Sequence, residues 1–130
     1  MPEVSTTVTV DRSADDVWDV VRDVGALDGW MPMVEACELD GDSRTVTLAG
    51  GLGTLVEKIL SVEDDDRTLT YTITDGPMAF ERYLATWTVV PAGDGADVTW
   101  KVDIEPEDFV DLMKGTQEAT LAGLKEHLEA

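Results

Sequence analysis

Residues 50–73 read "GGLGTLVEKILSVEDDDRTLTYTI" and contain the pattern that decides the fold. A glycine-rich turn precedes the strand-like run Leu55–Val62, along which successive side chains would point to opposite faces. The acidic turn Glu63–Arg67 then leads into a second strand-like segment, Thr68–Thr74. Two such segments joined by a short turn predict neighbouring antiparallel strands.

The same alternation of strand and turn extends in both directions. Between Val34 and Glu105 the turn signals recur roughly every ten residues, and the alternating segment Glu3–Val10 adds a strand at the N-terminus. Short turns throughout predict a single antiparallel sheet. The strands that we expect after the first are Val34–Leu39, Arg44–Leu48, Leu55–Val62, Thr68–Thr74, Phe80–Val90 and Val98–Glu105.

Helical signals lie near the two ends of the chain. Ser13 is expected to cap a short helix that Gly25 closes, and the next residues, up to Pro32, predict a second short helical turn. Pro106 suits a first helical position, and one long helix is expected over Glu107–Leu128. This order predicts an α+β fold in a single domain over residues 1–130, with a strongly curved sheet around the terminal helix.

The charge balance excludes several classes of partner. Asp and Glu number 28 against 9 Lys and Arg, a net charge of −19, and the acids are spread along the whole chain. Nucleic acids and anionic lipids need basic residues, so neither is expected as a partner. So acidic a surface favours a halophilic protein adapted to molar salt, and an acidic mesophilic protein is the alternative. No signal peptide or 18-residue apolar run is visible, so we expect a cytoplasmic protein without membrane insertion.

Metal and triad chemistry receive little support from the sequence. A single cysteine, Cys37, excludes an internal disulfide, and a single histidine, His127, excludes most histidine-based metal sites and catalytic triads. We expect no metal and no cofactor. Cys37 is interpreted as a small buried strand residue and His127 as part of a helix end.

The segments and their order resemble the helix-grip fold of the START, birch-pollen-allergen and polyketide-cyclase superfamily, often called SRPBCC. The resemblance implies seven strands, a long C-terminal helix, two short helices after the first strand and an internal cavity. Plant abscisic-acid receptors show a similar Gly-Leu gate loop and strand Glu, but the spacing between the two is shorter here, so hormone sensing is not implied. The segments that carry the resemblance are Val17–Val34, Gly50–Gly53, Val56–Ile73 and Tyr83–Trp100, together with the final helix.

The loop Gly50–Gly53 has three interpretations. A phosphate-binding loop would need a helix after the glycines, often with a Gly-Lys pair, and here a strand is expected to follow. A plain hairpin turn explains the glycines, as does a mobile gate that swings Leu52 over an opening. The family resemblance favours the gate.

Glu57 poses a related question, because both faces of its strand contain a charged residue and apolar residues. The resemblance implies that it faces the cavity. There, without a cation partner, its pKa would be raised and it would bind a ligand hydroxyl, an amine or a water. The alternative is a glutamate paired with a surface cation.

Other residues are expected to line the same cavity, with a solid core as the alternative. Two phenols lie on predicted inner rows of the sheet, and residues spaced i, i+4 and i+8 form a ladder on the long helix. A glutamine in that ladder needs a polar partner, which a wet cavity would supply. The predicted ligand-binding residues are Trp30, Leu52, Glu57, Tyr71, Tyr83, Trp87, Trp100, Phe109, Met113 and Gln117.

These features favour the binding or transport of a small hydrophobic, lipid-like or aromatic ligand by a monomer or weak dimer. The alternative is an enzyme of the polyketide cyclase or dehydratase type that uses Glu57, Tyr71 and Tyr83 as general acids and bases. No other catalytic residues are expected. A third hypothesis is an adaptor that associates with a partner through the face of the gate loop.

Overall fold

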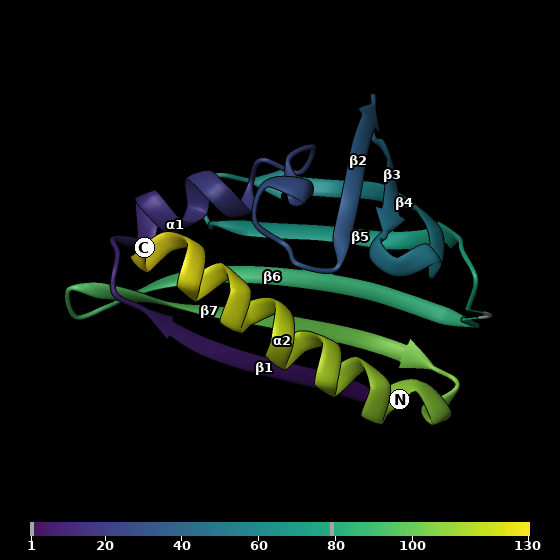
Figure 1. Ribbon diagram of the computed structural model, residues 1–130. Helices are drawn as coiled ribbons and strands as arrows, with labels where there is room; N and C mark the ends of the chain where they lie inside the picture. Colours follow the sequence, from purple (N-terminus) through teal and green to yellow (C-terminus); the bar gives the residue numbers. More distant parts are fainter. Residues whose placement is uncertain (1, 79) are drawn as a thin grey trace.

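The computed structural model describes residues 2–78 and 80–130, which form a curved antiparallel sheet around one long helix (Figure 1). The strands are β1 (Glu3–Val10), β2 (Val34–Asp40), β3 (Ser43–Leu48), β4 (Gly53–Glu63), β5 (Thr68–Asp75), β6 (Arg82–Ala92) and β7 (Gly95–Glu105). The helices are α1 (Ala14–Val21) and α2 (Val110–Glu129), with the short 3-10 turns η1 (Leu27–Gly29), η2 (Ala49–Gly51) and η3 (Glu107–Phe109).

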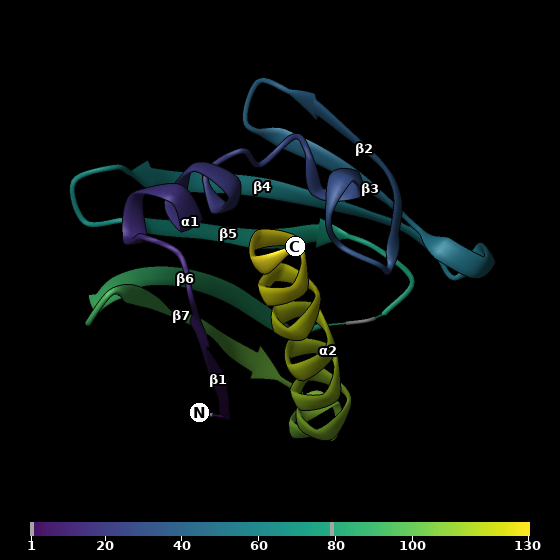
Figure 2. The ribbon, with the colours of Figure 1, turned by 60° about the vertical axis from the view of Figure 1, so that its left-hand side comes forward.

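The seven strands form one sheet in the order β1-β7-β6-β5-β4-β3-β2, and every neighbouring pair is antiparallel. The N-terminal strand β1 pairs with β7, which leaves β2 at the opposite edge. Helix α2 lies across the inner face of the sheet, and β2, β3 and β4 arch over it on one side (Figure 2). The predicted helix-grip fold is therefore confirmed.

Several local predictions are also confirmed, and others need correction. Ser13 caps α1, because its hydroxyl accepts a hydrogen bond from the backbone N–H of Asp16. The helix ends at Val21, however, before Gly25, and the second predicted helix is only the 3-10 turn η1. Pro106 precedes the turn η3 instead of opening the long helix, so regular α-helix begins at Val110.

The interior is filled most completely between α1, the C-terminal half of α2 and strands β1, β6 and β7. Here the apolar rows of the sheet meet the apolar stripes of both helices, as their periodicities require. At the other end of the interior, under β2, β3 and β4, the described residues Leu27, Val34 and Val46 form a separate, small cluster of buried apolar side chains. The residues buried in the filled half include Val10, Val17, Trp18, Val98, Leu121, Leu124 and Leu128. No helix among the described residues is long and apolar enough to cross a membrane.

Candidate ligand cavity

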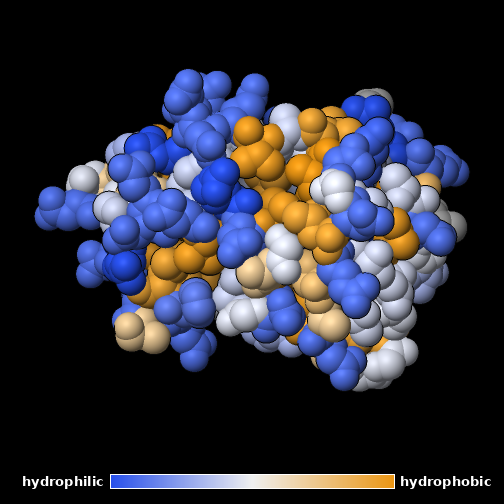
Figure 3. Space-filling model, turned by 90° about the horizontal axis from the view of Figure 1, so that it is seen from above, coloured by the Kyte–Doolittle hydropathy of each residue, from blue (hydrophilic) through white to orange (hydrophobic). Residues whose placement is uncertain are grey.

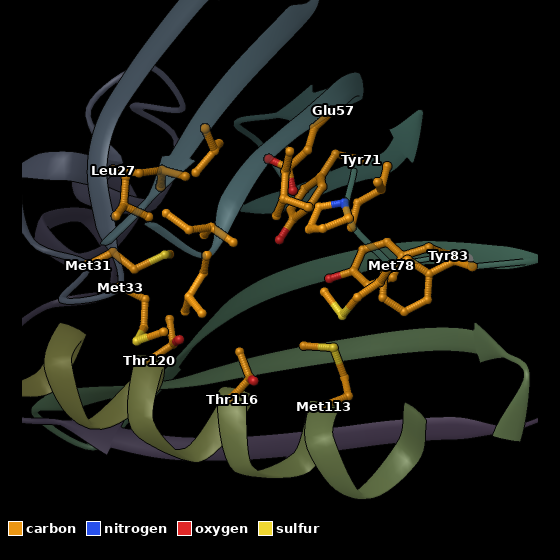
Figure 4. A pocket seen from close by; sticks show the side chains of 18 of the residues that line it. Leu27, Met31, Met33, Glu57, Tyr71, Met78, Tyr83, Met113, Thr116 and Thr120 are labelled. Carbon is orange, nitrogen blue, oxygen red and sulfur yellow. The ribbon is translucent and has the colours of Figure 1, made fainter. Parts of the chain in front are cut away.

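A cavity of about 410 Å³ lies between the inner face of the sheet and the N-terminal half of α2 (Figure 4). Its walls are mainly aliphatic and aromatic side chains from η1, β3, β4, β5, β6 and β7. Helix α2 contributes Leu112, Met113, Thr116 and Thr120, of which the last three are shorter or more flexible than the leucines farther along the same helix. A largely apolar cavity of this size is typical of small-molecule binding sites.

Four of the five methionines line this cavity: Met31, Met33, Met78 and Met113. Methionine is unbranched and has a polarisable sulfur, so it adapts to ligands of different shapes. Figure 4 shows these side chains on several sides of the space, from the η1 region, the β5–β6 connection and α2. The lining therefore suits an apolar ligand, which is held by packing, better than a polar ligand, which needs directed hydrogen bonds.

The one ion pair in the described lining joins Arg44 of β3 and Glu57 of β4. These residues face each other directly across the two strands. The Arg44 Nε–Glu57 Oε1 distance is 2.8 Å and the Nη2–Oε1 distance is 2.7 Å. Arg44 also donates from Nη1 to the carbonyl of Val24, and its guanidinium stacks over the ring of Tyr71 at 4.7 Å. Exposed fractions of 2% for Arg44 and 5% for Glu57 show that the pair is removed from solvent.

Burial and pairing act in opposite directions on the two charges. Burial raises the pKa of the Glu57 carboxyl, and the attraction of Arg44 reduces that rise without cancelling it. Burial works to lower the pKa of Arg44, but the attraction and hydrogen bond of Glu57, together with Tyr71 and Cys37, outweigh it, so this pKa is raised. The β4–β5 pairing also shifts register between Val56 and Glu57, a local irregularity of the kind that redirects side chains at binding sites.

Two phenols lie on the same wall as the ion pair. Tyr71 accepts a hydrogen bond of 3.3 Å from the indole N–H of Trp87, and Tyr83 lies on the neighbouring strand. Burial raises the pKa of both hydroxyls, and the negative charge of Glu57 raises them further. Both hydroxyls are therefore protonated near neutral pH and act as hydrogen-bond donors. In Figure 4 the oxygens of Glu57, Tyr71 and Tyr83 turn toward the interior of the cavity.

The mouth of the cavity is formed by exposed apolar side chains. Leu52, with an exposed fraction of 57%, lies in the β3–β4 connection, and Met33 and Leu112 lie on the other sides of the opening. Figure 3 shows apolar surface of this kind interrupting a mainly hydrophilic face. Apolar side chains exposed around a cavity are typical of a surface that a ligand passes or covers.

The glycine loop has a conformation that only glycine adopts easily. Gly50 has a φ of 73° and Gly53 a φ of 120°, and a side chain on Gly53 would also approach the ring of Pro77 to 3.3 Å. A strand follows the loop, as predicted, so the loop lacks the helix N-terminus that a phosphate-binding loop of this kind requires. The loop joins two strands, as a hairpin does, and it places Leu52 at the mouth, as a gate would.

Most of the predicted ligand-binding residues line the cavity, but three do not. Trp30 and Trp87 lie behind the wall, where the two rings meet edge to face at 6.1 Å and Trp87 stacks on Trp100. Gln117 points away from the cavity toward β1. The residues that do line it are Leu52, Glu57, Tyr71, Tyr83, Trp100, Phe109 and Met113.

The prediction for Gln117 was wrong because strand β1 supplies its polar partners. Its amide oxygen accepts a 2.7 Å hydrogen bond from the Thr6 hydroxyl, and its amide nitrogen donates to the carbonyl of Val4 at 3.0 Å. The side chain is fully buried. No wet cavity is needed to satisfy it, so the glutamine belongs to the helix–sheet packing.

The prediction that Glu57 lacks a cation partner was also wrong, although its inward direction is correct. The missed residue is Arg44, which the strand prediction placed at the start of β3 but left without a role. A usable signal existed at the hairpin. Leu48 and Gly53 face each other beside the turn, and counting four residues outward on each strand places Arg44 opposite Glu57.

Among residues 2–78 and 80–130, no group of three or more His, Cys, Asp or Glu side chains is arranged so that it could hold a metal ion. Cys37 is half-buried on β2, and its thiol is 3.7 Å from the carbonyl of Val24. Burial raises the pKa of this thiol, which lowers its reactivity as a nucleophile.

The model of one protein family, described as "Polyketide cyclase / dehydrase and lipid transport", matches residues 1–129. No match was found among curated proteins. XoxI from Bacillus cereus has the same fold, with a TM-score of 0.92, 23% identity and coverage of 98% of this chain and 96% of that chain. A START superfamily protein from Mycobacterium smegmatis aligns with a TM-score of 0.85, 21% identity and coverage of 98% and 97%.

Norcoclaurine synthase from Thalictrum flavum, solved in complex with dopamine and hydroxybenzaldehyde, aligns with a TM-score of 0.73 and 22% identity. The alignment covers 98% of this chain and 86% of the synthase. At these identities the three structures show a common fold and nothing finer.

Proposed function

Because the chain belongs to the polyketide cyclase / dehydrase and lipid transport family, we propose that it binds a small hydrophobic ligand and carries or sequesters it. The ligand would occupy the cavity between the sheet and α2 and enter past Leu52. Lipid-like and aromatic molecules both suit a lining of aliphatic, aromatic and methionine side chains.

The observation that supports this proposal best is the cavity itself. A space of about 410 Å³ with mainly apolar walls lies in a protein whose other half is filled by buried side chains. Exposing apolar walls to water is unfavourable, and a bound apolar ligand removes that cost in proportion to the area covered. The exposed leucine and methionine side chains at the mouth give such a ligand an apolar path inward.

The direct test is binding of a neutral apolar fluorescent probe, N-phenyl-1-naphthylamine, to the folded protein. We expect saturable binding at roughly micromolar concentration, about −8 kcal/mol. Substituting Met113, on the cavity wall, with Trp should block binding, whereas Lys114→Trp, the adjacent exposed position on α2, should not. The proposal would be refuted if the probe bound neither the wild-type protein nor the Lys114→Trp variant, or if it bound only as the protein unfolds. Native mass spectrometry of protein purified from its own host would then identify a co-purifying ligand.

A catalytic role is the second candidate, because Glu57, Tyr71 and Tyr83 share one wall of the cavity. Protonated phenols can donate hydrogen bonds to a substrate carbonyl, and a carboxylate can accept a proton, as cyclisation or dehydration of a polyketide would require. The ion pair with Arg44 stabilises the charged carboxylate and makes it a weaker base. Turnover of hydroxylated aromatic or polyketide substrates that is lost in Tyr83→Phe, with ligand binding retained, would establish the enzyme. Binding without turnover supports the carrier.

A further inference from the structure

We infer that the ligand is a neutral apolar molecule bearing a hydroxyl group, an alcohol or a phenol, and that it binds with this hydroxyl against Glu57. The inference rests on the proposed function, since it names the ligand class for the same cavity. It follows from two properties of the Arg44–Glu57 pair: one carboxylate oxygen still has room to accept a hydrogen bond, and the net charge of the pair is zero.

The first step is that Arg44 is already engaged. Nε and Nη2 both contact Oε1 of Glu57, and Nη1 donates to the carbonyl of Val24. One face of the guanidinium lies over the ring of Tyr71. Each of its nitrogens therefore has a protein partner, and a ligand carboxylate would have to displace Glu57 to form the bidentate contact that arginine favours.

The second step is that Glu57 is engaged on one side only. Both contacts from Arg44 go to Oε1, and none of the described residues donates a hydrogen bond to Oε2. A carboxylate oxygen accepts and does not donate, so this oxygen suits a ligand O–H or N–H. The protonated hydroxyl of Tyr83 on the same wall is a donor. A ligand hydroxyl suits this wall, since it donates to Oε2 and keeps lone pairs that can accept a hydrogen bond.

The third step is the charge of the site. Among the described residues that line the cavity, those with ionisable side chains are Arg44, Glu57, Tyr71 and Tyr83. The tyrosines are neutral and the ion pair sums to zero. A buried ligand carboxylate would add an uncompensated negative charge, and a ligand ammonium an uncompensated positive one. Either ion would lose its hydration without gaining a free counter-charge, whereas a hydroxyl would not.

The experiment uses three ligands that share one chain and differ in the head group: 1-decanol, decanoate and decylamine. Each competes with N-phenyl-1-naphthylamine at pH 7, where the acid and the amine are both charged. For the wild-type protein we expect decanol to bind about tenfold more tightly than either ion, because each ion loses its hydration on burial without gaining a free counter-charge.

The decisive variant is Glu57→Gln, with Glu63→Gln, an exposed position on the same strand, as the matched control. Glutamine retains one oxygen for Arg44, replaces Oε2 by a donor and leaves the arginine charge uncompensated. We expect decanol to bind about tenfold more weakly and decanoate to bind more tightly, so the order of the two ligands reverses. A purely structural role of Glu57 would weaken all ligands together. Glu63→Gln should leave the order unchanged.

The outcomes separate this inference from the proposed function. If the wild-type protein does not bind the probe, the proposed function fails. If the probe binds but the three ligands compete equally, or Glu57→Gln changes all three alike, the hydroxyl inference fails and the carrier function stands. If Glu57→Gln does not fold, the double variant Arg44→Leu/Glu57→Leu replaces the pair by apolar side chains. It should bind the probe with no advantage for decanol over 1-chlorodecane, an isosteric ligand without a donor, and a retained advantage would contradict the inference.

Discussion

Gln117 and Glu57 are both polar, both buried and both directed into the interior, yet their surroundings differ. Gln117 has both ends of its amide satisfied by β1, through Thr6 and Val4. Glu57 has one oxygen paired with Arg44 and a second to which no described residue donates a hydrogen bond. A fully satisfied buried group contributes to packing, whereas a partly satisfied one facing a cavity is available to a ligand.

The same contrast extends to the two halves of the interior. Toward its C-terminus, α2 presents Leu121, Leu124 and Leu128, which fill the space against α1 and the sheet. Toward its N-terminus the side chains on the cavity wall include Thr116 and Thr120, which are too short to reach across to β4 and β5. One helix thus packs a core with one half and leaves a binding cavity with the other.

The largest effect on the free energy of unfolding is expected from breaking the Arg44–Glu57 ion pair in the cavity wall. Arg44→Met leaves a buried carboxylate without its counter-charge, which typically lowers the free energy of unfolding by about 3–5 kcal/mol. Urea denaturation at pH 7 measures this loss. A decrease below about 1 kcal/mol would show that water reaches Glu57 in the folded protein. The surroundings of Glu57 and Gln117 would then differ less than the structure indicates.

The pH dependence of that loss tests its cause. Burial raises the pKa of Glu57 and Arg44 opposes the rise, so removing Arg44 raises the folded-state pKa further above the unfolded value. The folded variant then binds a proton that the unfolded chain releases. Its stability therefore falls as the pH rises through the window between the two pKa values, and recovers below it. The deficit relative to wild type should shrink from pH 8 to pH 5, and a constant deficit would exclude this explanation.

The contrast between the filled and the hollow half can be measured with two truncations on one helix. Leu124 is fully buried, and Leu124→Ala should cost about 2–5 kcal/mol because it creates a cavity in packed surroundings. Met113 already borders open space, so Met113→Ala should cost less than about 2 kcal/mol. Equal losses in urea denaturation would mean that the cavity closes in solution.

A smaller effect is expected at Gln117. Gln117→Leu removes the acceptor of the Thr6 hydroxyl and a donor to the Val4 carbonyl, which should cost about 1–3 kcal/mol. Probe binding should not change, because this side chain does not line the cavity. Weaker probe binding at unchanged stability would reverse the assignment and return the glutamine to the ligand site.

The smallest effect on stability is expected at the mouth. Leu52 is mostly exposed, so Leu52→Ser should change the free energy of unfolding by no more than about 0.5 kcal/mol. If the loop acts as a gate, the probe should dissociate about threefold faster in stopped-flow measurements, because the leucine no longer covers it. An unchanged dissociation rate would support the plain hairpin.

Much of the fold was predictable from local pattern. The seven strands, the Ser13 cap and the long terminal helix follow from side-chain alternation, turn residues and helical spacing, which depend on neighbours in the sequence. Helix ends were less well predicted. Pro106 is compatible with both a helix start and the turn before it, and the structure selects the turn.

The candidate site was predicted in part, and its errors share one cause. Alternation along β4 places Glu57 on a face but does not say what lies opposite, so the charge on Arg44 was missed. Helical spacing places Gln117 on the inner side of α2, but only the rotation of α2 against β1 decides that it meets Thr6 and not the cavity.

The sequence by itself therefore determined the elements, their order and the apolar rows that face inward, because each of these depends on periodicity along the chain. The tertiary structure alone decided three further features: the cross-strand pairing of Arg44 with Glu57, the satisfaction of Gln117 by β1 and the space left beside Thr116 and Thr120. Each of these features depends on distances between side chains on different elements, which the curvature of the sheet and the position of α2 fix only when the chain has folded.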